Sequence, residues 1–409
     1  MRRRRERYTF FNENERMYSV HSQYPDVTLS KRVSELDIER RALWAGLFCS
    51  LFGLVVGLIV FAGERPPLFG DLSVGIVSAA CGAVSAGTSS AYAFRSMLRA
   101  REPWLKKIPK WRQIITALGL VLVHVASSVM ILLVVFHLFQ QAFYGLHLDV
   151  LAGALAVSVA TGISAYLSLE ATARINAESL SVVLGIFMGA GVLISMLLAE
   201  DQGWWQSMFS SLGTTQAGMG SFWTFNLTLV ISGLVLAAFT EFLTRDLVRL
   251  AQSYRCRPAL ERYRIARMVR PRPWLVRWCL LIVSVGIIGI GLVPFDVAME
   301  VHSAFVQMVS AAMIFLLLGT VVLLPGYPAV FHMLSYAAIG AIWAAFQLWS
   351  EWSYYNLTGF ELSVVAIMFS WISVFIRTTS AMTQDRSEPR TTHSPSEVAK
   401  AKKSAAKGG

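Results

Sequence analysis

Ten long apolar segments alternate with shorter polar ones along the 409 residues of the chain. Each segment is close to or longer than the roughly 20 residues that an α-helix needs to cross about 30 Å of hydrocarbon. The pattern therefore predicts an all-α, polytopic bundle of about ten transmembrane helices. The predicted spans are residues 42–63, 73–94, 114–139, 150–169, 180–200, 222–244, 275–294, 303–325, 328–350 and 359–376.

Lysines and arginines fall almost entirely on one side of these spans. Of the 36 basic residues, only Arg65 lies in a loop on the opposite side. The N-terminal arm, the loops 95–112 and 245–272 and the C-terminal tail are basic. By the positive-inside rule, we expect a multi-pass protein of the cell (plasma) membrane with both termini in the cytoplasm. The opposite loops carry acidic residues instead: Glu64, Asp71, Asp149, Glu200, Asp201, Asp296, Glu300 and Glu351.

Composition agrees with a membrane protein. The chain is 55% hydrophobic and 15% charged, whereas soluble domains are about 25% charged. A net charge of +11 could indicate nucleic acid as a partner, but the basic residues border membrane spans. We therefore expect no nucleic acid and instead an attraction to membrane lipids, with anionic lipid headgroups at the cytoplasmic face, worth about 1 kcal/mol per basic residue.

Cysteines and aromatic residues fit the same topology. Cys49, Cys81 and Cys279 lie in predicted spans and Cys256 lies in a cytoplasmic loop, so no disulfide is expected. Tryptophan and tyrosine residues mark the predicted water boundaries. They are Trp104, Trp111, Trp274 and Trp278 at the inner ends, and Trp204, Trp205, Trp223, Trp349, Trp352, Tyr354 and Tyr355 at the outer ends.

The pattern divides the chain into four parts. Residues 1–41 are a basic cytoplasmic arm, in which leucine and valine recur at helical spacing, so this arm is either a short interfacial helix or disordered. Residues 42–179 hold four spans and residues 180–377 hold six. Residues 378–409 predict a disordered basic tail. Spans one to four and five to eight share an orientation, but no residue identity establishes a repeat.

Small residues recur every four positions in two spans. The ladders are Ser78, Gly82, Ala86 and Ser90 in the second span, and Ala156, Ala160, Ser164 and Ser168 in the fourth. Gly185 and Gly189 form a GxxxG motif in the fifth span. Such faces let helix backbones approach closely in lipid, so we interpret them as packing surfaces rather than a pore lining.

Candidate binding residues gather at the outer ends of the last six spans. They are Ser211 in the longest outer loop, Asn226, Asp296, His302 and Glu361. Polar groups at membrane depth are costly and often functional, so these residues predict a shallow, outward-facing site for the headgroup of a lipid or amphiphile. A close approach of Asp296 and His302 would favour the charged imidazole. The alternative is that the five side chains only cap helix ends.

Enzymatic activity has little support in the sequence. Catalytic zinc needs three protein ligands, usually including histidines, whereas the histidines here are scattered among His124, His147, His302 and His332. No HExxH motif or nucleophile elbow is present. We therefore expect no metal or cofactor, assign no catalytic residue, and rank an intramembrane hydrolase below the other functions.

A permease or transporter subunit is the main alternative function. Coupled carriers place ionisable groups near mid-bilayer, but Glu241 lies close to the inner end of the sixth span, where we expect it to snorkel. The chain has no GxxxxGK[ST] motif, so any ATPase would be a separate subunit. The basic loop 245–272 is then either a docking surface for that partner or a solvated determinant of orientation.

Three short motifs in the last six spans match a known pattern. The first is a Ser-x-x-Gly-like turn before a helix that begins with Asn, and the second is a glycine-rich helix that ends in a Gly-x-Phe-Pro-x-Asp-like turn followed by His. The third is a last helix that begins with Gly and Glu and contains a later Trp. The matching residues are Ser210 to Gly213, Phe225 to Leu227, Gly233, Gly291 to Asp296, His302, Gly359, Glu361 and Trp371.

With these motifs, residues 180–377 resemble the bacterial DUF998 family, which is similar to the Frag1/DRAM/Sfk1 membrane proteins of eukaryotes. The chain departs from the pattern at Val293, where Phe is usual, and in its four additional helices. The resemblance implies a six-helix bundle with a link to membrane lipids or envelope physiology, and no established reaction. Its motif positions include Asn226, Asp296, His302 and Glu361.

Overall fold

The computed structural model describes residues 34–253 and 271–387. Within these ranges the structure is helical without strands, and ten helices are long and apolar enough to cross a membrane. The predicted all-α bundle of ten spans is thus confirmed, and the chain is a multi-pass membrane protein. The helices are α2 (Glu35–Val60), α3 (Val74–Ala93), α5 (Lys110–Ala142), α6 (Val150–Ala173), α7 (Ala177–Leu197), α8 (Met219–Ser253), α10 (Pro273–Leu292), α11 (Met299–Leu318), α13 (Ala329–Ser350) and α14 (Leu357–Ser387).

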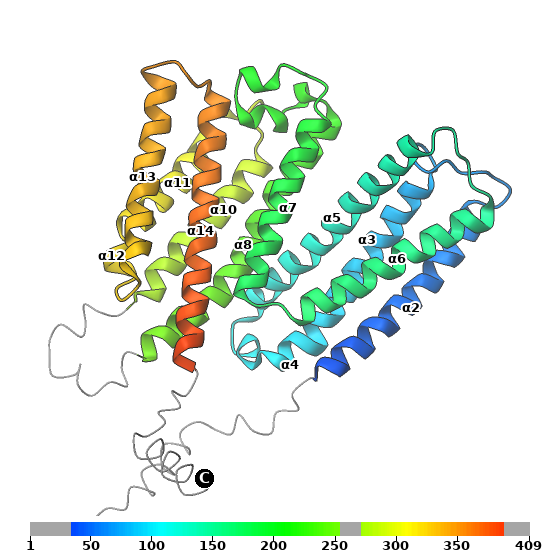
Figure 1. The fold of residues 1–409 in the computed structure, drawn as a ribbon, viewed down its shortest axis with the longest axis horizontal. Helices are drawn as coiled ribbons and strands as arrows, with labels where there is room; N and C mark the ends of the chain where they lie inside the picture. Colours follow the sequence, from blue (N-terminus) through cyan, green and yellow to red (C-terminus); the bar gives the residue numbers. More distant parts are fainter. Residues whose placement is uncertain (1–33, 254–270, 388–409) are drawn as a thin grey trace, which may run out of the picture.

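The helices form two groups that lie side by side (Figure 1). The first group contains α2, α3, α5 and α6, and the second contains α7, α8, α10, α11, α13 and α14. The chain passes from one group to the other between α6 and α7. We call "inner" the helix ends that meet the basic loops, and "outer" the opposite ends.

Helices α5 and α8 connect the two groups. Leu120 and Val123 of α5 belong to the large apolar core of the second group, and Gly119 brings the two backbones together, since a Cβ there would lie 2.7 Å from the carbonyl oxygen of Leu234. The groups converge at their inner ends and diverge toward their outer ends (Figure 1). The two groups therefore pack against each other mainly in the inner half.

Small residues pack the first group, as the ladders predict. A Cβ on Gly82 would lie 2.6 Å from the side chain of Leu132. Ser128 of α5 donates a 2.9 Å hydrogen bond to Ser164 of α6. These short side chains allow close contact between the helices, and Ser128 and Ser164 also satisfy each other's hydroxyl groups in apolar surroundings.

Only one of the two glycines in the GxxxG motif of α7 packs against another helix. A Cβ on Gly185 would lie 2.7 Å from the ring of Phe369 in α14, whereas one on Gly189 would meet no atom within 4 Å. Gly185 is therefore a contact between helices, and Gly189 is not.

Three helices extend well beyond their predicted ends, and α8 is one of them, since it continues past residue 244 to Ser253. α2 begins at Glu35 because Ser34 caps it: the Ser34 hydroxyl accepts from the Asp37 backbone N–H at 3.0 Å. The described part of the proposed interfacial helix is thus the start of α2. α14 continues past Thr378, the predicted start of the disordered tail, and ends at Ser387.

Orientation in the membrane stays a prediction of the charge pattern. We expect a cysteine in place of Ser211 or Tyr354 to react with an impermeant thiol reagent on intact cells, and one in place of Ser253 to react only after permeabilisation. Tyr354 is well exposed at an outer end. Labelling at Ser253 in intact cells would reverse the assigned orientation.

Candidate functional site

The loop between α7 and α8 folds over the outer ends of the second group. It consists of three short turns, η3 (Trp204–Gln206), η4 (Phe209–Gly213) and η5 (Thr215–Ala217). Phe209 and Leu212 of η4 are buried against α8. This loop is the partner of several side chains predicted to bind a ligand.

Asn226 and Glu361 both bond the backbone of this loop. The Asn226 amide, buried in α8, donates to the carbonyl oxygen of Gly213 at 2.8 Å. The Glu361 carboxylate, in the first turns of α14, accepts from the N–H of Phe209 at 2.5 Å. Each side chain supplies a hydrogen-bond partner to a backbone group of the loop that would otherwise lack one.

Asp296 and His302 have separate partners. The Asp296 carboxylate accepts from the N–H and the hydroxyl of Thr215, at 3.1 Å and 3.0 Å. Nδ1 of His302 lies 2.8 Å from the carbonyl oxygen of Val293, and its ring contacts Phe295 edge-on. Among the described residues, no ion pair joins Asp296 to His302. The turn between α10 and α11 therefore holds the histidine.

Ser211 lies within the loop and bonds Ser207, with 2.7 Å between the hydroxyl oxygens. Two further side chains, which the sequence does not single out, bond the backbone of this loop. Ser221 donates to the carbonyl oxygen of Leu212, and Asn356 donates to that of Trp205. The structure thus brings Asn226, Asp296, Glu361 and Ser211 to one loop. There they fasten the chain to itself, which weakens the case for a headgroup site among them.

Histidines and acidic residues do not converge on a metal site. Within residues 34–253 and 271–387, no group of three His, Cys, Asp or Glu side chains could hold an ion. His124 lies in α5, His302 at an outer end, and His332 in the first turn of α13.

The prediction that Glu241 snorkels is wrong. Its side chain is only 6% exposed and receives two guanidinium groups from neighbouring helices. Arg112 of α5 donates through Nε at 2.8 Å and also contacts the second carboxylate oxygen, and Arg277 of α10 donates at 3.0 Å. The charge stays in the protein because arginines from both helix groups neutralise it there.

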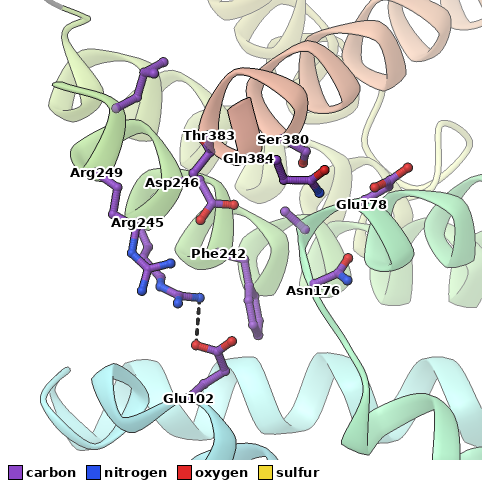
Figure 2. Close-up of a pocket in the computed structure, with 12 residues that line it drawn as sticks. Glu102, Asn176, Glu178, Phe242, Arg245, Asp246, Arg249, Ser380, Thr383 and Gln384 are labelled. Atoms are coloured by element: carbon purple, nitrogen blue, oxygen red, sulfur yellow. Dashed lines mark ion pairs between the residues drawn. The ribbon is translucent and has the colours of Figure 1, made fainter. Parts of the chain in front are cut away.

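A cavity of about 570 Å³ lies one to two turns further toward the inner end. Its lining comes from both groups. Glu102 precedes η2 (Pro103–Lys106) in the first group, and the other residues belong to the second, where Asn176 caps α7 and the rest lie in α7, α8 and α14. Figure 2 shows the side chains that surround it. The polar ones are Glu102, Asn176, Glu178, Arg245, Asp246, Arg249, Ser380, Thr383 and Gln384.

One of the two arginines that line the cavity already has an acidic partner. Arg245 forms a 2.7 Å ion pair with Glu102 (Figure 2) and lies over the ring of Trp104, 5.3 Å from its centroid. The indole N–H of Trp104 donates to Glu102 at 2.8 Å. These three side chains fix the inner loop of the first group against α8.

Two carboxylates of the cavity have no direct polar partner in the described part of the chain, although Arg245 and Arg249 of the same helix lie close enough to attract that of Asp246. Among the described residues, neither the half-buried Asp246 nor Glu178 forms an ion pair or a side-chain hydrogen bond. Thr383 lies beside Asp246, with Glu178 across the cavity (Figure 2). Glu102, Glu178 and Asp246 face two arginines, so the described lining has a net charge of −1 (3 acidic less 2 basic).

A sequence signal for these inner residues does exist. Glu241, Arg245 and Arg249 recur at intervals of four, which places them along one side of α8. The sequence alone predicts a snorkelling residue at the first position and a basic loop at the other two, because it does not reveal their distant partners. Asp246 has no comparable signal.

The chain was also compared with known proteins. No protein-family model, curated protein or solved structure matches it.

Proposed function

We propose that this membrane protein binds an amphiphile in the cavity at its inner ends, and that the ligand carries a primary amine. The observation that supports this most is that two carboxylates, Asp246 and Glu178, line a polar cavity between the two helix groups without an ion pair or side-chain hydrogen bond among the described residues. An ammonium group supplies three donors and one positive charge, which matches this side of the lining.

The cavity also offers a basic partner, Arg249, to an acidic group of the ligand. Arg249 lines the same cavity and, unlike Arg245, has no ion pair among the described residues. An acidic group such as a phosphate could accept from its guanidinium. Phe242 adds an apolar surface beside these groups. A zwitterionic headgroup fits the lining better than a purely anionic one.

Asp246→Asn tests this function because it removes the charge and keeps the size. In nanodiscs with equal amounts of phosphatidylethanolamine and phosphatidylcholine, we expect the wild type to retain the ethanolamine lipid preferentially, since a trimethylated amine has no N–H to donate. The variant should lose about tenfold in that preference, the value of one charge-assisted hydrogen bond. Native mass spectrometry of the retained lipids measures it.

Asp385→Asn is the matched control. Asp385 is an exposed carboxylate near the same end of α14 but does not line the cavity, so its variant should behave as wild type. Equal retention of both lipids by the wild type, or an unchanged preference in Asp246→Asn, would contradict the proposal.

A permease is the second candidate, because the cavity lies between two helix groups while the α7–α8 loop is fastened over the outer ends. Rocking of one bundle against another around a central site is a common transport mechanism. Transfer of a labelled ethanolamine lipid across proteoliposomes, abolished in Asp246→Asn, would favour it over a binding protein.

Membership of residues 180–377 in a DUF998-like group remains part of the proposal. It is supported by Asn226, Asp296 and Glu361, which occupy motif positions and all bond the loop that contains Ser210 to Gly213. In this view the motif maintains the outer loop, and the ligand binds elsewhere.

A further inference from the structure

The cluster of Arg112, Glu241 and Arg277 has a net charge of +1. Arg112 and Arg277 both bond the Glu241 carboxylate, so two guanidinium groups share one negative charge. Among the described residues, neither arginine has an ion pair with any other carboxylate. A net charge of +1 left in a region of low dielectric is unfavourable unless a further anion is close.

The depth of the cluster is that of lipid headgroups. Arg112 lies in the first turn of α5 and Arg277 in the second turn of α10, both at inner ends. Well-exposed tryptophans accompany them: Trp111 beside Arg112, and Trp274 and Trp278 on either side of Arg277. Exposed tryptophans mark the membrane interface, where lipid phosphates also lie.

Unused donors of the cluster reach the surface. Among the described residues, Arg277 bonds Glu241 through Nη2 alone. The side chains of Arg112 and Arg277 remain 17% and 18% exposed, and neither contributes a buried nitrogen without a partner. Their other N–H groups are thus available to an external acceptor, and a guanidinium fork matches the geometry of phosphate.

We propose that the phosphate of an anionic lipid completes this cluster, bound between the inner ends of α5 and α10. The lipid needs a net negative charge, because its role is to balance the second arginine. A zwitterionic lipid supplies the phosphate but brings its own cation. This site is separate from the cavity, and its test does not depend on the ligand proposed there.

Phosphatidylglycerol is the probe. The purified protein is placed in nanodiscs that contain equal amounts of phosphatidylglycerol and phosphatidylcholine, and native mass spectrometry measures the lipid that stays bound. The wild type should retain phosphatidylglycerol preferentially. Arg277→Gln should reduce that preference about tenfold, as expected for the loss of charge-assisted hydrogen bonds, whereas Arg277→Lys should keep part of it.

Glu241→Gln separates binding from a purely structural role. This change frees donors on both arginines and should raise the retention of phosphatidylglycerol, whereas a structural cluster would lose stability without a change in lipid preference. Arg272→Gln is the control, since Arg272 is an exposed basic residue at the same end of α10. If Arg277→Gln fails to fold, Arg277→Lys and Glu241→Gln still decide the question.

Two results would overturn the proposal. The first is an unchanged lipid preference in the folded arginine variants or in Glu241→Gln. The second is displacement of phosphatidylglycerol by millimolar inorganic phosphate, which would assign the site to a soluble anion instead of a lipid.

Discussion

Replacing Glu241 by leucine is expected to destabilise the protein by about 3 kcal/mol, the low end of the range for breaking a buried ion pair. The carboxylate is 6% exposed, and its loss leaves two guanidinium groups without their shared carboxylate partner, the one acidic side chain that pairs with them among the described residues. The low end is appropriate because both arginines keep some access to water. The free energy of unfolding, measured by reversible denaturation in mixed micelles, checks this value.

A variant in which Arg112, Glu241 and Arg277 are all replaced by leucine is the decisive comparison. Because it leaves no charge unpaired, it should recover most of the loss seen in Glu241→Leu. Glu178→Leu, which removes an exposed carboxylate that has no ion pair within residues 34–253 and 271–387, should cost less than about 0.5 kcal/mol. If Glu241→Leu costs no more than Glu178→Leu, the cluster does not stabilise the contact between the two helix groups.

Gly119→Leu is expected to force the two helix groups apart. A Cβ at this position would lie 2.7 Å from the oxygen and 2.9 Å from the carbon of the Leu234 carbonyl. These are backbone atoms of α8, which cannot move aside as a side chain does, so α5 and α8 must separate. We expect a loss of about 3 kcal/mol, the upper end for overpacking, seen as a lower melting temperature in detergent.

Gly189→Leu is the control for this prediction. Gly189 lies in a spanning helix of the same fold, but no atom is within 4 Å of its Cβ position, so leucine there should change stability by less than about 0.5 kcal/mol. Spin labels on the outer ends of α5 and α7 should also report a longer distance in Gly119→Leu and no change in Gly189→Leu. Equal melting temperatures for the two variants would show that α5 and α8 are not tightly packed at Gly119.

The predicted headgroup site shows what sequence reasoning recovers in part. Asn226, Asp296 and Glu361 were singled out because polar groups are costly at membrane depth, and that reasoning located residues that do share one loop. It could not tell an external ligand from an internal partner, because each of the three side chains bonds a backbone N–H or C=O. All residues carry these groups, except that proline lacks the N–H, so the residue type does not reveal the partner.

Hydropathy and charge along the chain were enough to predict the ten spans, their alternating basic and acidic boundaries and the small-residue faces of α3 and α6. These features depend on about 20 neighbouring residues at a time, so they can be recognised locally. The contacts between side chains could not be predicted in this way. Glu241 bonds Arg112 and Arg277 across separations of 129 and 36 residues, and Asp246 faces a cavity while Arg245 of the same turn bonds Glu102. Such contacts depend on how each helix is rotated about its own axis against its neighbours, and that rotation is set by packing between distant segments rather than by the local sequence.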